Sequence, residues 1–491
     1  MPENKIFALF KKLFDIKIMI MKRILILFAT LCAAVAMDAK VVLPHVLGDN
    51  MVLQRDTEVK LWGTAKPGKK VTVTPSWSGT PVTVKAGKDG KWVASVKTGA
   101  AGGPYSIVFD DGEKLTVENV LLGEVWFCSG QSNMEMPVKG FGNQPVEGNA
   151  EVILEARPET PIRMCTVKRE TAFEEKDDCT AAWLEHTPEA VGNTSATAYF
   201  FAEYLNKVLD VPVGIIVSCW GGTRIEAWMN RETVSAFPGY DLSYLDTKEK
   251  APRWDDPALM YNAMVAPVRN YTIKGFLWYQ GEANRNRNKD YAKLQPAYVN
   301  MMRGLWGLGE LPFYYVQIAP YCYENPDEVG SALLREAQMK NMSEIPHSGM
   351  AVTLDIGDKD CIHPAKKREV GHRLAYMALE KDYGFKAIDP YPPVYQSMEV
   401  KDGKAILTFK VGNMGMCPRG HALTGFEVAG EDKVFHPAEA VIRKGNQVEV
   451  ICKEVPVPVA VRYCFYNWTD KACLTNNYGI PASSFRTDDW E

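Results

Sequence analysis

Short runs in which apolar and polar residues alternate fill both ends of the chain. They cover residues 40–118 and residues 389–491, and turns rich in Gly, Pro and Asp separate them. A two-residue period is typical of strands that bury one face. Clear examples are Val59 to Trp62, Lys70 to Val73, Ala405 to Phe409 and Val448 to Ile451. We therefore predict an N-terminal antiparallel β-sandwich over residues 40–118 and a C-terminal β domain over residues 389–491.

The pattern changes between residues 119 and 388, where continuous apolar runs alternate with helical stretches. In Ala198 to Leu209, for example, Phe201, Leu205 and Val208 fall on one helical face. Short, fully apolar strands are buried on both faces, as in a parallel sheet covered by helices. This region therefore predicts an α/β domain. Its expected strands are Glu124 to Cys128, Val213 to Cys219, Gly275 to Tyr279, Phe313 to Ile318 and Met350 to Leu354.

Residues 1–39 have the pattern of a leader and secretory signal peptide. Lys22 and Arg23 precede the apolar run Ile24 to Leu31, and small residues follow up to Ala36. The run is too short for a membrane span, and we expect cleavage near Ala36. The mature protein is therefore expected to be secreted or periplasmic, with no integral membrane span.

Composition narrows the functional classes. The formal net charge of −4 and the scattered basic residues provide no basic stripe for phosphates, so nucleic acid is not an expected partner. No CxxC pair or His/Cys cluster has zinc-site spacing, so we expect neither a metal nor another cofactor. The eleven cysteines allow disulfides in an oxidising compartment, but their spacing does not give the pairing. Oligomeric state does not follow from the sequence.

A candidate nucleophile follows the first strand of the α/β domain. Ser132 lies in Gly130-Gln131-Ser132-Asn133-Met134, at the carboxyl end of a strand, where open parallel sheets build their sites. A serine in this place also serves as a helix N-cap, so the motif needs supporting residues.

The candidate base is His363, because it follows a strand-end loop and precedes Pro364, which can begin a helix. Asp360, three residues earlier, is spaced to orient the imidazole. Asp358 and Asp355 compete for this role but lie farther away along the chain. The alternative is an aspartate that caps a helix beside a surface histidine.

Two further strand-end segments offer donors for an oxyanion. Trp220-Gly221-Gly222-Thr223-Arg224 has glycines that let the backbone approach a ligand closely, although a tight turn without function explains them equally well. Gln280-Gly281-Glu282-Ala283-Asn284 offers two side-chain amides. Arg224 and Glu226 are expected to pair as a strut below the site, with contact to a substrate carboxylate as the alternative.

Together these segments resemble the sialate O-acetylesterase family, in the family's order. The resemblance extends to Leu47 through Arg55 and to Gly479 through Ser483, and so covers nearly all of the mature chain. Two positions depart from the family pattern: Ala263 stands where glycine is usual, and Ala283 stands where serine is common. Neither departure removes a catalytic group.

The resemblance implies an SGNH-type, flavodoxin-like three-layer catalytic domain over residues 119–388. Antiparallel β domains would flank it on both sides in the sequence. The resemblance also implies hydrolysis of O-acetyl esters on sialic acids through an acyl-enzyme, without a metal. The implied triad is Ser132, His363 and Asp360. The implied oxyanion donors are the N–H groups of Ser132 and Gly222 and the side chain of Gln280, with Asn284 as second choice.

Two other functions stay open at this point. An esterase acting on acetylated xylan or another polysaccharide would carry nearly the same active-site segments. A glycan-binding protein without activity would use the β domains and the twelve tryptophans. The complete set of serine, histidine, aspartate and oxyanion donors counts against a pure binder.

Overall fold

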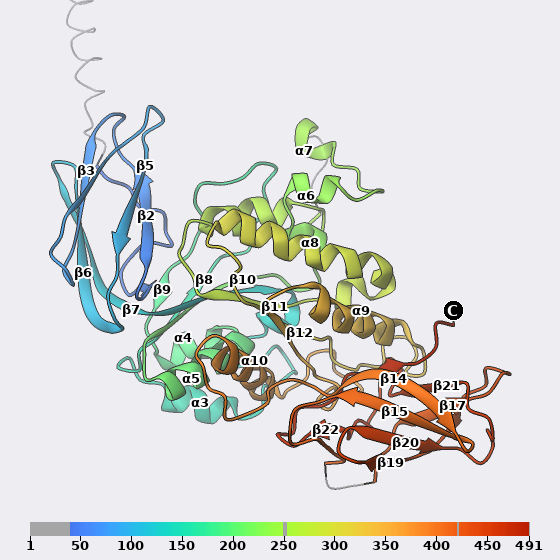
Figure 1. The fold of residues 1–491 in the computed structure, drawn as a ribbon. Coiled ribbons are helices and arrows are strands. Elements are labelled where there is room, and N and C mark those ends of the chain that lie inside the picture. Colours follow the sequence, from blue (N-terminus) through green and yellow to red (C-terminus); the bar gives the residue numbers. More distant parts are fainter. Residues whose placement is uncertain (1–39, 249–252, 420–421, 491) are drawn as a thin grey trace, which may run out of the picture.

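The computed structural model describes residues 40–248, 253–419 and 422–490 (Figure 1). The predicted leader and signal peptide lie outside these residues. The chain forms a mixed α/β fold with one large mixed sheet and several separate antiparallel sheets. Within the described ranges, no helix is both long enough and apolar enough to cross a bilayer.

The N-terminal β region confirms the alternating pattern, since β5 buries every second residue. β2 pairs with β5, β3 pairs with β4 and β6, and β6 pairs with β7, all antiparallel, whereas β1 runs parallel to β7. The strands are β1 (Val52–Gln54), β2 (Glu58–Thr64), β3 (Lys70–Pro75), β4 (Val82–Lys85), β5 (Lys91–Lys97), β6 (Gly102–Asp110) and β7 (Lys114–Gly130).

Strand β7 connects this region to the central sheet. Its 17 residues pair with β6 near Lys114 and with β10 and β11 near Gly130. The predicted domain boundary after residue 118 therefore lies inside a strand rather than in a linker. Glu124, in the middle of β7, accepts hydrogen bonds from Gln54, Arg55 and Tyr383, so segments far apart in sequence meet on it.

The central sheet has the order β13-β12-β11-β7-β10-β8-β9, and every pair is parallel except β8 with β9. Each of the five predicted strands overlaps an observed one, and their order across the sheet is second, first, third, fourth, fifth. The last one is displaced, because β13 covers Ser348–Ala351 and shares only Met350 and Ala351 with the predicted Met350 to Leu354. Strand β8 was not predicted. The strands after β7 are β8 (Ile162–Thr166), β9 (Trp183–Leu184), β10 (Val213–Cys219), β11 (Gly275–Tyr279), β12 (Phe313–Val316) and β13 (Ser348–Ala351).

Helices lie on both sides of this sheet, with α8 and α9 on one side and α5 and α10 on the other (Figure 1). The helices are α2 (Ser132–Glu135), α3 (Asn149–Glu155), α4 (Pro188–Asn193), α5 (Ala196–Leu209), α6 (Arg231–Ser235), α7 (Tyr244–Thr247), α8 (Asn288–Trp306), α9 (Gly330–Glu344) and α10 (Lys367–Lys381). Short π or 3₁₀ turns are η1 (Ile225–Trp228), η2 (Tyr261–Val265), η3 (Ala266–Val268) and η4 (Glu282–Arg287).

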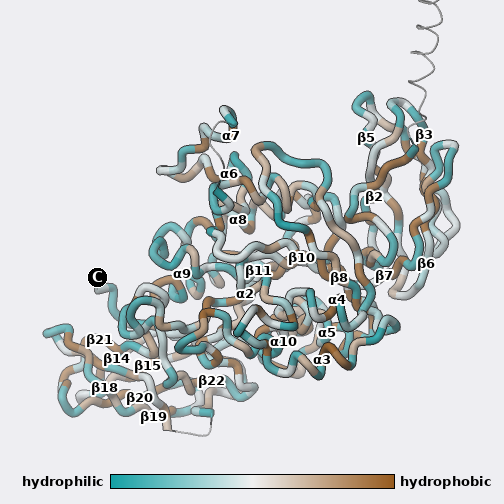
Figure 2. Tube along the Cα trace, turned by 180° about the vertical axis from the view of Figure 1, so that it is seen from behind, coloured by the Kyte–Doolittle hydropathy of each residue, from teal (hydrophilic) through white to brown (hydrophobic). Residues whose placement is uncertain are grey.

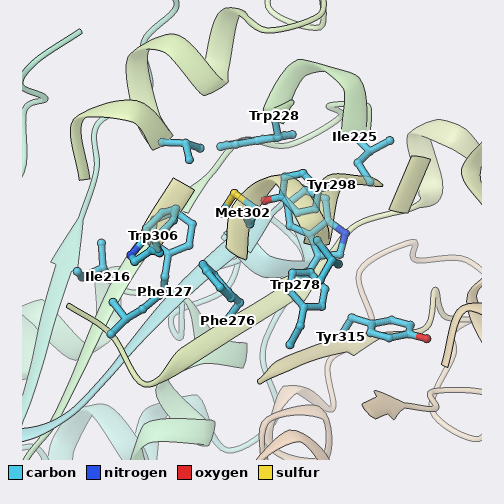
Figure 3. Close-up of a cluster of buried hydrophobic side chains, with 14 of the residues drawn as sticks. Phe127, Ile216, Ile225, Trp228, Phe276, Trp278, Tyr298, Met302, Trp306 and Tyr315 are labelled. Atoms are coloured by element: carbon cyan, nitrogen blue, oxygen red, sulfur yellow. The ribbon is translucent and has the colours of Figure 1, made fainter. Parts of the chain in front are cut away.

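The core is built by side chains that alternate across the sheet. Trp126 packs against Phe201 of α5 at 4.9 Å between ring centroids, whereas its neighbour Phe127 packs against Trp306 of α8 at 5.3 Å. Figure 3 shows the cluster on the α8 side of the sheet, to which Phe127 and Trp306 belong. In it, Trp228, Trp278 and Tyr298 gather between α8 and the sheet. Hydrophobic residues concentrate along the central strands in Figure 2. The strands are therefore buried on both faces, as their apolar runs predicted.

The C-terminal region is antiparallel throughout its described residues. One sheet has the order β14-β15-β20-β19, a second has β18-β17-β21-β23, and β16 pairs with β22. The strands are β14 (Val394–Lys401), β15 (Lys404–Lys410), β16 (Met416–Cys417), β17 (Phe426–Ala429), β18 (His436–Pro437), β19 (Glu439–Arg443), β20 (Gln447–Ile451), β21 (Ala460–Tyr463), β22 (Thr475–Asn476) and β23 (Phe485–Arg486).

Candidate active site

Three neighbouring strands end at the same level of the sheet. In the parallel ladders, Gly130 of β7 is the register partner of Cys219 of β10 and of Tyr279 of β11. The segments that follow these residues therefore meet at one edge, which brings the three predicted motifs together. The close approach requires glycine at position 130, because its φ is +143° and a Cβ there would lie 2.1 Å from the Tyr279 carbonyl oxygen.

Ser132 begins the short helix α2, one residue beyond this edge, and is half-buried. Its hydroxyl has no hydrogen-bond partner among the described residues, and its backbone N–H has none either. The N-cap residue is Gln131, so Ser132 is not the helix N-cap that the alternative interpretation required. The hydroxyl and the N–H are thus both available to a ligand.

The segment after β10 packs directly against the serine. A Cβ on Gly221 would lie 3.1 Å from Ser132 Cβ, and the Gly221 N–H donates to Glu135 Oε2 at 2.8 Å. Gly222 has a φ of +74° and is exposed, and its N–H has no partner among the described residues. The N–H groups of Ser132 and Gly222 are therefore free donors near the nucleophile candidate, as an oxyanion hole requires.

His363 lies in the loop between β13 and α10 and is partly buried. Its Nδ1 is 2.7 Å from Gln144 Oε1, and its ring meets Phe141 edge to face at 5.3 Å. The Gln144 oxygen only accepts, so Nδ1 carries the proton and Nε2 keeps its lone pair. Burial, assisted by the nearby positive charge of Lys367, lowers the pKa of His363 to about 4. The imidazole is therefore neutral at neutral pH, the form that a general base needs.

Asp360 is exposed and does not contact His363 in this structure. Its backbone N–H donates to Asp358 Oδ1 at 2.8 Å, and its carboxylate has no partner among the described residues. Of the competing aspartates, Asp355 is tied to Arg373 and Arg419. Helix α10 begins at Lys367, so the expectation that Pro364 begins it was wrong. The structure thus gives His363 Nδ1 a neutral amide partner in Gln144.

The two candidate amides, Gln280 and Asn284, are fully buried behind the site. Gln280 Nε2 donates to Asn284 Oδ1 at 2.7 Å and has Thr223 O and Gln131 Oε1 within reach. Asn284 Nδ2 donates to Glu226 Oε2 at 2.9 Å. The protons of the Gln280 amide thus have acceptors inside the protein, and both side chains brace the edge on which the backbone donors sit.

Asn133, the residue after the serine, is the centre of a buried polar network. Its Nδ2 donates to Glu282 Oε1 at 2.6 Å and to Ile362 O at 3.0 Å, and its Oδ1 accepts from Lys367 Nζ at 2.5 Å. Lys367 is fully buried, and burial lowers its pKa to about 7. Burial also raises the pKa of Glu282. The Asn133 side chain therefore joins α2, which carries Ser132, to the segment after β11 and to the loop that carries His363.

Arg224 and Glu226 do not form the ion pair that was expected. Arg224 pairs with Asp255 at 3.0 Å, whereas buried Glu226 binds Asn284, Arg287 and the hydroxyl of Tyr240. Glu226 is nonetheless structural, because all of these partners lie within the protein.

The described cysteines are free thiols. Cys128 and Cys219 are buried in strands β7 and β10. Across the described ranges, no group of three His, Cys, Asp or Glu side chains is arranged to hold a metal ion.

Gln144 and Lys367 were not predicted from the sequence. Gln144 lies 219 residues from His363 in sequence, and no motif marks it. Lys367 has the sequence appearance of an ordinary charged residue at a helix start. Its only signal is its position four residues after His363, at the first residue of α10.

Comparison with known proteins agrees with this arrangement. The family model described as "Carbohydrate esterase, sialic acid-specific acetylesterase" matches residues 122–380, more than half of the chain and the whole of the edge described above. The chain belongs to this carbohydrate esterase family. Membership makes it a hydrolase of the ester-cleaving class, for which an acetylated carbohydrate is the fitting substrate.

Individual relatives extend the similarity beyond the family match. The human sialate O-acetylesterase is 31% identical over 397 residues, which are 74% of this chain and 75% of the human protein. The mouse sialate O-acetylesterase is 28% identical over 417 residues, which are 73% of this chain and 76% of its own. A crystal structure of a carbohydrate acetylesterase from Xanthomonas citri is 36% identical, with a TM-score of 0.83, and covers 92% of this chain and 100% of its own.

Proposed function

We propose that this protein is a secreted or periplasmic sialate O-acetylesterase that works through an acyl-enzyme on Ser132. The observation that carries the proposal is the pairing of an unbonded serine hydroxyl with two unbonded N–H groups, of Ser132 and Gly222, at one edge of the sheet. The sialate relatives support the choice of sugar.

In the first half of the reaction, Ser132 Oγ attacks the acetyl carbonyl carbon while His363 Nε2 accepts its proton. The negative charge on the carbonyl oxygen is stabilised by the N–H groups of Ser132 and Gly222. The C–O bond to the sugar then breaks, and His363 returns the proton to the leaving alcohol. The products are a free sugar hydroxyl and acetyl-Ser132.

In the second half, water attacks the acetyl-Ser132 carbonyl while His363 again accepts a proton. Acetate leaves, and the hydroxyl of Ser132 is restored. Asp360 is proposed as the carboxylate that orients His363 and stabilises its charged form during both halves. This assignment rests on spacing and family resemblance. The side chain of Gln280, with Asn284 as second choice, was expected to donate to the oxyanion. Because the amide protons of Gln280 have acceptors inside the protein, we propose instead that both side chains support the segment that carries the N–H donors.

Without β8, which adds a further parallel strand beside β10, the five predicted strands have the order of flavodoxin-like sheets, and this supports an SGNH-type three-layer catalytic domain. We also propose the division into an N-terminal β-sandwich domain over residues 40–118, a catalytic domain over 119–388 and a C-terminal β domain over 389–491.

The test of the reaction compares the wild type with Ser132→Ala on 4-nitrophenyl acetate. The variant is expected to lose at least about 10³-fold in kcat. Equal turnover by both proteins, or none by either, would refute the assignment of Ser132. The second outcome would leave the glycan-binding protein as the better explanation.

The test of the substrate compares acetate release from an O-acetylated sialic acid and from acetylated xylan. We expect a higher kcat/KM on the sialic acid. The similarity to the Xanthomonas citri carbohydrate acetylesterase favours a broader second candidate, an esterase of other acetylated glycans. A preference for xylan would select that candidate and leave the mechanism unchanged.

A further inference from the structure

Trp254 differs from every other tryptophan of the chain. All twelve tryptophans are described, and eleven of them are buried or partly buried. Trp254 alone is exposed, with 41% of its surface accessible. Single exposed apolar residues are common on protein surfaces, so the exposure of Trp254 gains meaning only from its place beside the candidate site.

The ring lies beside the proposed oxyanion hole. A Cβ on Gly222 would lie 2.9 Å from Trp254 Cη2 and 3.4 Å from Cζ3, so the outer edge of the six-membered indole ring occupies the space beside Gly222. A Cβ on the preceding residue, Gly221, would lie 3.1 Å from Ser132 Cβ. Consecutive α-carbons are about 3.8 Å apart. The exposed ring and the nucleophile therefore flank the same pair of glycines.

The turn that carries the ring is held in place on this edge. Asp255, the next residue, receives two contacts from Arg224, at 3.0 Å to its carboxylate and 3.3 Å to its carbonyl oxygen. The N–H of Ala258 then donates to Glu226 O at 3.0 Å. Both anchors belong to the segment after β10, the same segment that supplies Gly221 and Gly222. The turn that carries the indole is thus fastened to the segment that supplies the proposed oxyanion donor.

We propose that the exposed face of Trp254 is a binding platform for the pyranose ring whose acetyl ester reacts at Ser132. This inference rests on the proposed function. A sugar ring presents C–H groups on one face and hydroxyls around its rim, so it matches a flat apolar surface that excludes water on one side only. Acetyl carbonyl and sugar ring would then occupy the two sides of Gly222.

The test measures kinetics on an O-acetylated sialic acid and on ethyl acetate, which has no ring to stack. For Trp254→Ala, the ratio of kcat/KM between the sugar ester and ethyl acetate is expected to fall about tenfold, mainly through KM. Trp254→Phe keeps a flat apolar ring and is expected to restore most of the ratio. An unchanged ratio in Trp254→Ala would overturn the platform, as would equal losses in the Phe and Ala variants.

A matched control is Phe385→Ala, since Phe385 is also 41% exposed but follows the end of α10 and lies outside the site. It is expected to leave both activities unchanged. A loss confined to the sugar ester in this variant would also overturn the proposal. Failure of the proposed function is separate, because it appears as ethyl acetate hydrolysis that survives Ser132→Ala.

Discussion

Asn133 Nδ2 donates a hydrogen bond to the carbonyl oxygen of Ile362 at 3.0 Å, so the residue after the proposed nucleophile, Ser132, holds the peptide before the proposed base, His363. The same side chain contacts Glu282 and Lys367, which are both buried. The alignment of Ser132 with His363 therefore depends on a third residue that touches neither the acetyl group nor the transferred proton. Asn133 is, in this sense, a positioning residue.

Replacing Asn133 with Ala is expected to lower kcat about 10- to 100-fold with little change in KM, because a small misplacement of reacting groups is costly. The free energy of unfolding should also fall by about 1–3 kcal/mol, because buried partners lose their hydrogen bonds. Steady-state kinetics and urea denaturation measure the two effects.

The matched control is Asn149→Ala, which removes an exposed amide that donates to Lys139 O. It should change neither quantity appreciably. A normal kcat in Asn133→Ala would show that the histidine loop holds its position without this contact.

Activity should persist into acid further than an ordinary histidine allows. The proposed mechanism requires neutral His363, and burial together with the charge of Lys367 lowers the pKa of this histidine to about 4. Since the protonated form is disfavoured, kcat/KM should stay level as pH falls through 6.5 and decline only as it nears 4. A pH profile on 4-nitrophenyl acetate measures the midpoint. A midpoint at 6.5 or above would contradict the buried, neutral imidazole.

Lys367→Met should raise the pH at which kcat/KM declines in acid. At pH values below its own pKa of about 7, Lys367 is charged and disfavours a second positive charge on His363. Removing the charge therefore raises the pKa of His363 and shifts the midpoint toward the ordinary value. The pH profiles of wild type and variant, measured in one buffer series, make the comparison. An unchanged midpoint would show that burial alone sets the pKa.

Asp360→Asn and Gln144→Ala should separate charge stabilisation from simple orientation of His363. A carboxylate stabilises the imidazolium that forms during acyl transfer, and its loss is expected to cost about 10²- to 10⁴-fold in kcat. A neutral amide contributes one ordinary hydrogen bond, worth about 1 kcal/mol, so the loss of Gln144 is expected to cost less than about tenfold. The reverse order of effects would make Gln144 the orienting residue and would remove Asp360 from the triad.

Gly221→Ala should impair catalysis by crowding the nucleophile. The new methyl carbon would lie 3.1 Å from both Ser132 Cβ and Glu135 Oε2, which is tighter than ordinary contact. We expect kcat to fall about 10- to 100-fold, as for other small displacements of a reacting group. Gly304→Ala, in α8 with open space around it, is the control and should slightly raise the thermal midpoint. Full activity in Gly221→Ala would mean that the serine has room to shift.

Strands could be predicted from the sequence where burial on both faces leaves only apolar residues. Val213 to Cys219 and Gly275 to Tyr279 were predicted with the bounds that the structure shows. β8 was missed because Arg163 interrupts its apolar pattern. The structure buries this side chain anyway, and its guanidinium donates to the carbonyl oxygens of Thr160 and Ile162. A charged residue that finds nearby backbone acceptors is not distinguishable in sequence from one that faces water.

The site was predictable to the extent that parallel strands end together. That rule placed Ser132 and Gly222 at one edge, whereas it could not say that the amide of Gln280 points inward, because side-chain direction depends on acceptors from three other segments. Gln144 and Trp254 come from loops without periodicity. Their places beside His363 and Gly222 follow only from tertiary contacts, which single-sequence patterns do not encode.

Strand β7 connects the proposed nucleophile, Ser132, to the N-terminal β region through one continuous strand. Its first residues pair with β6, its middle with β1, and its last residue immediately precedes the Gln131–Ser132 step. A truncation that begins at residue 119 would cut this strand and strip β1 and β6 from its flank. The proposed nucleophile, Ser132, thus follows closely on a strand whose other end belongs to the N-terminal β region. Loss of that region would leave the first part of β7 without its β6 and β1 partners, in the same continuous stretch of backbone that leads to Ser132.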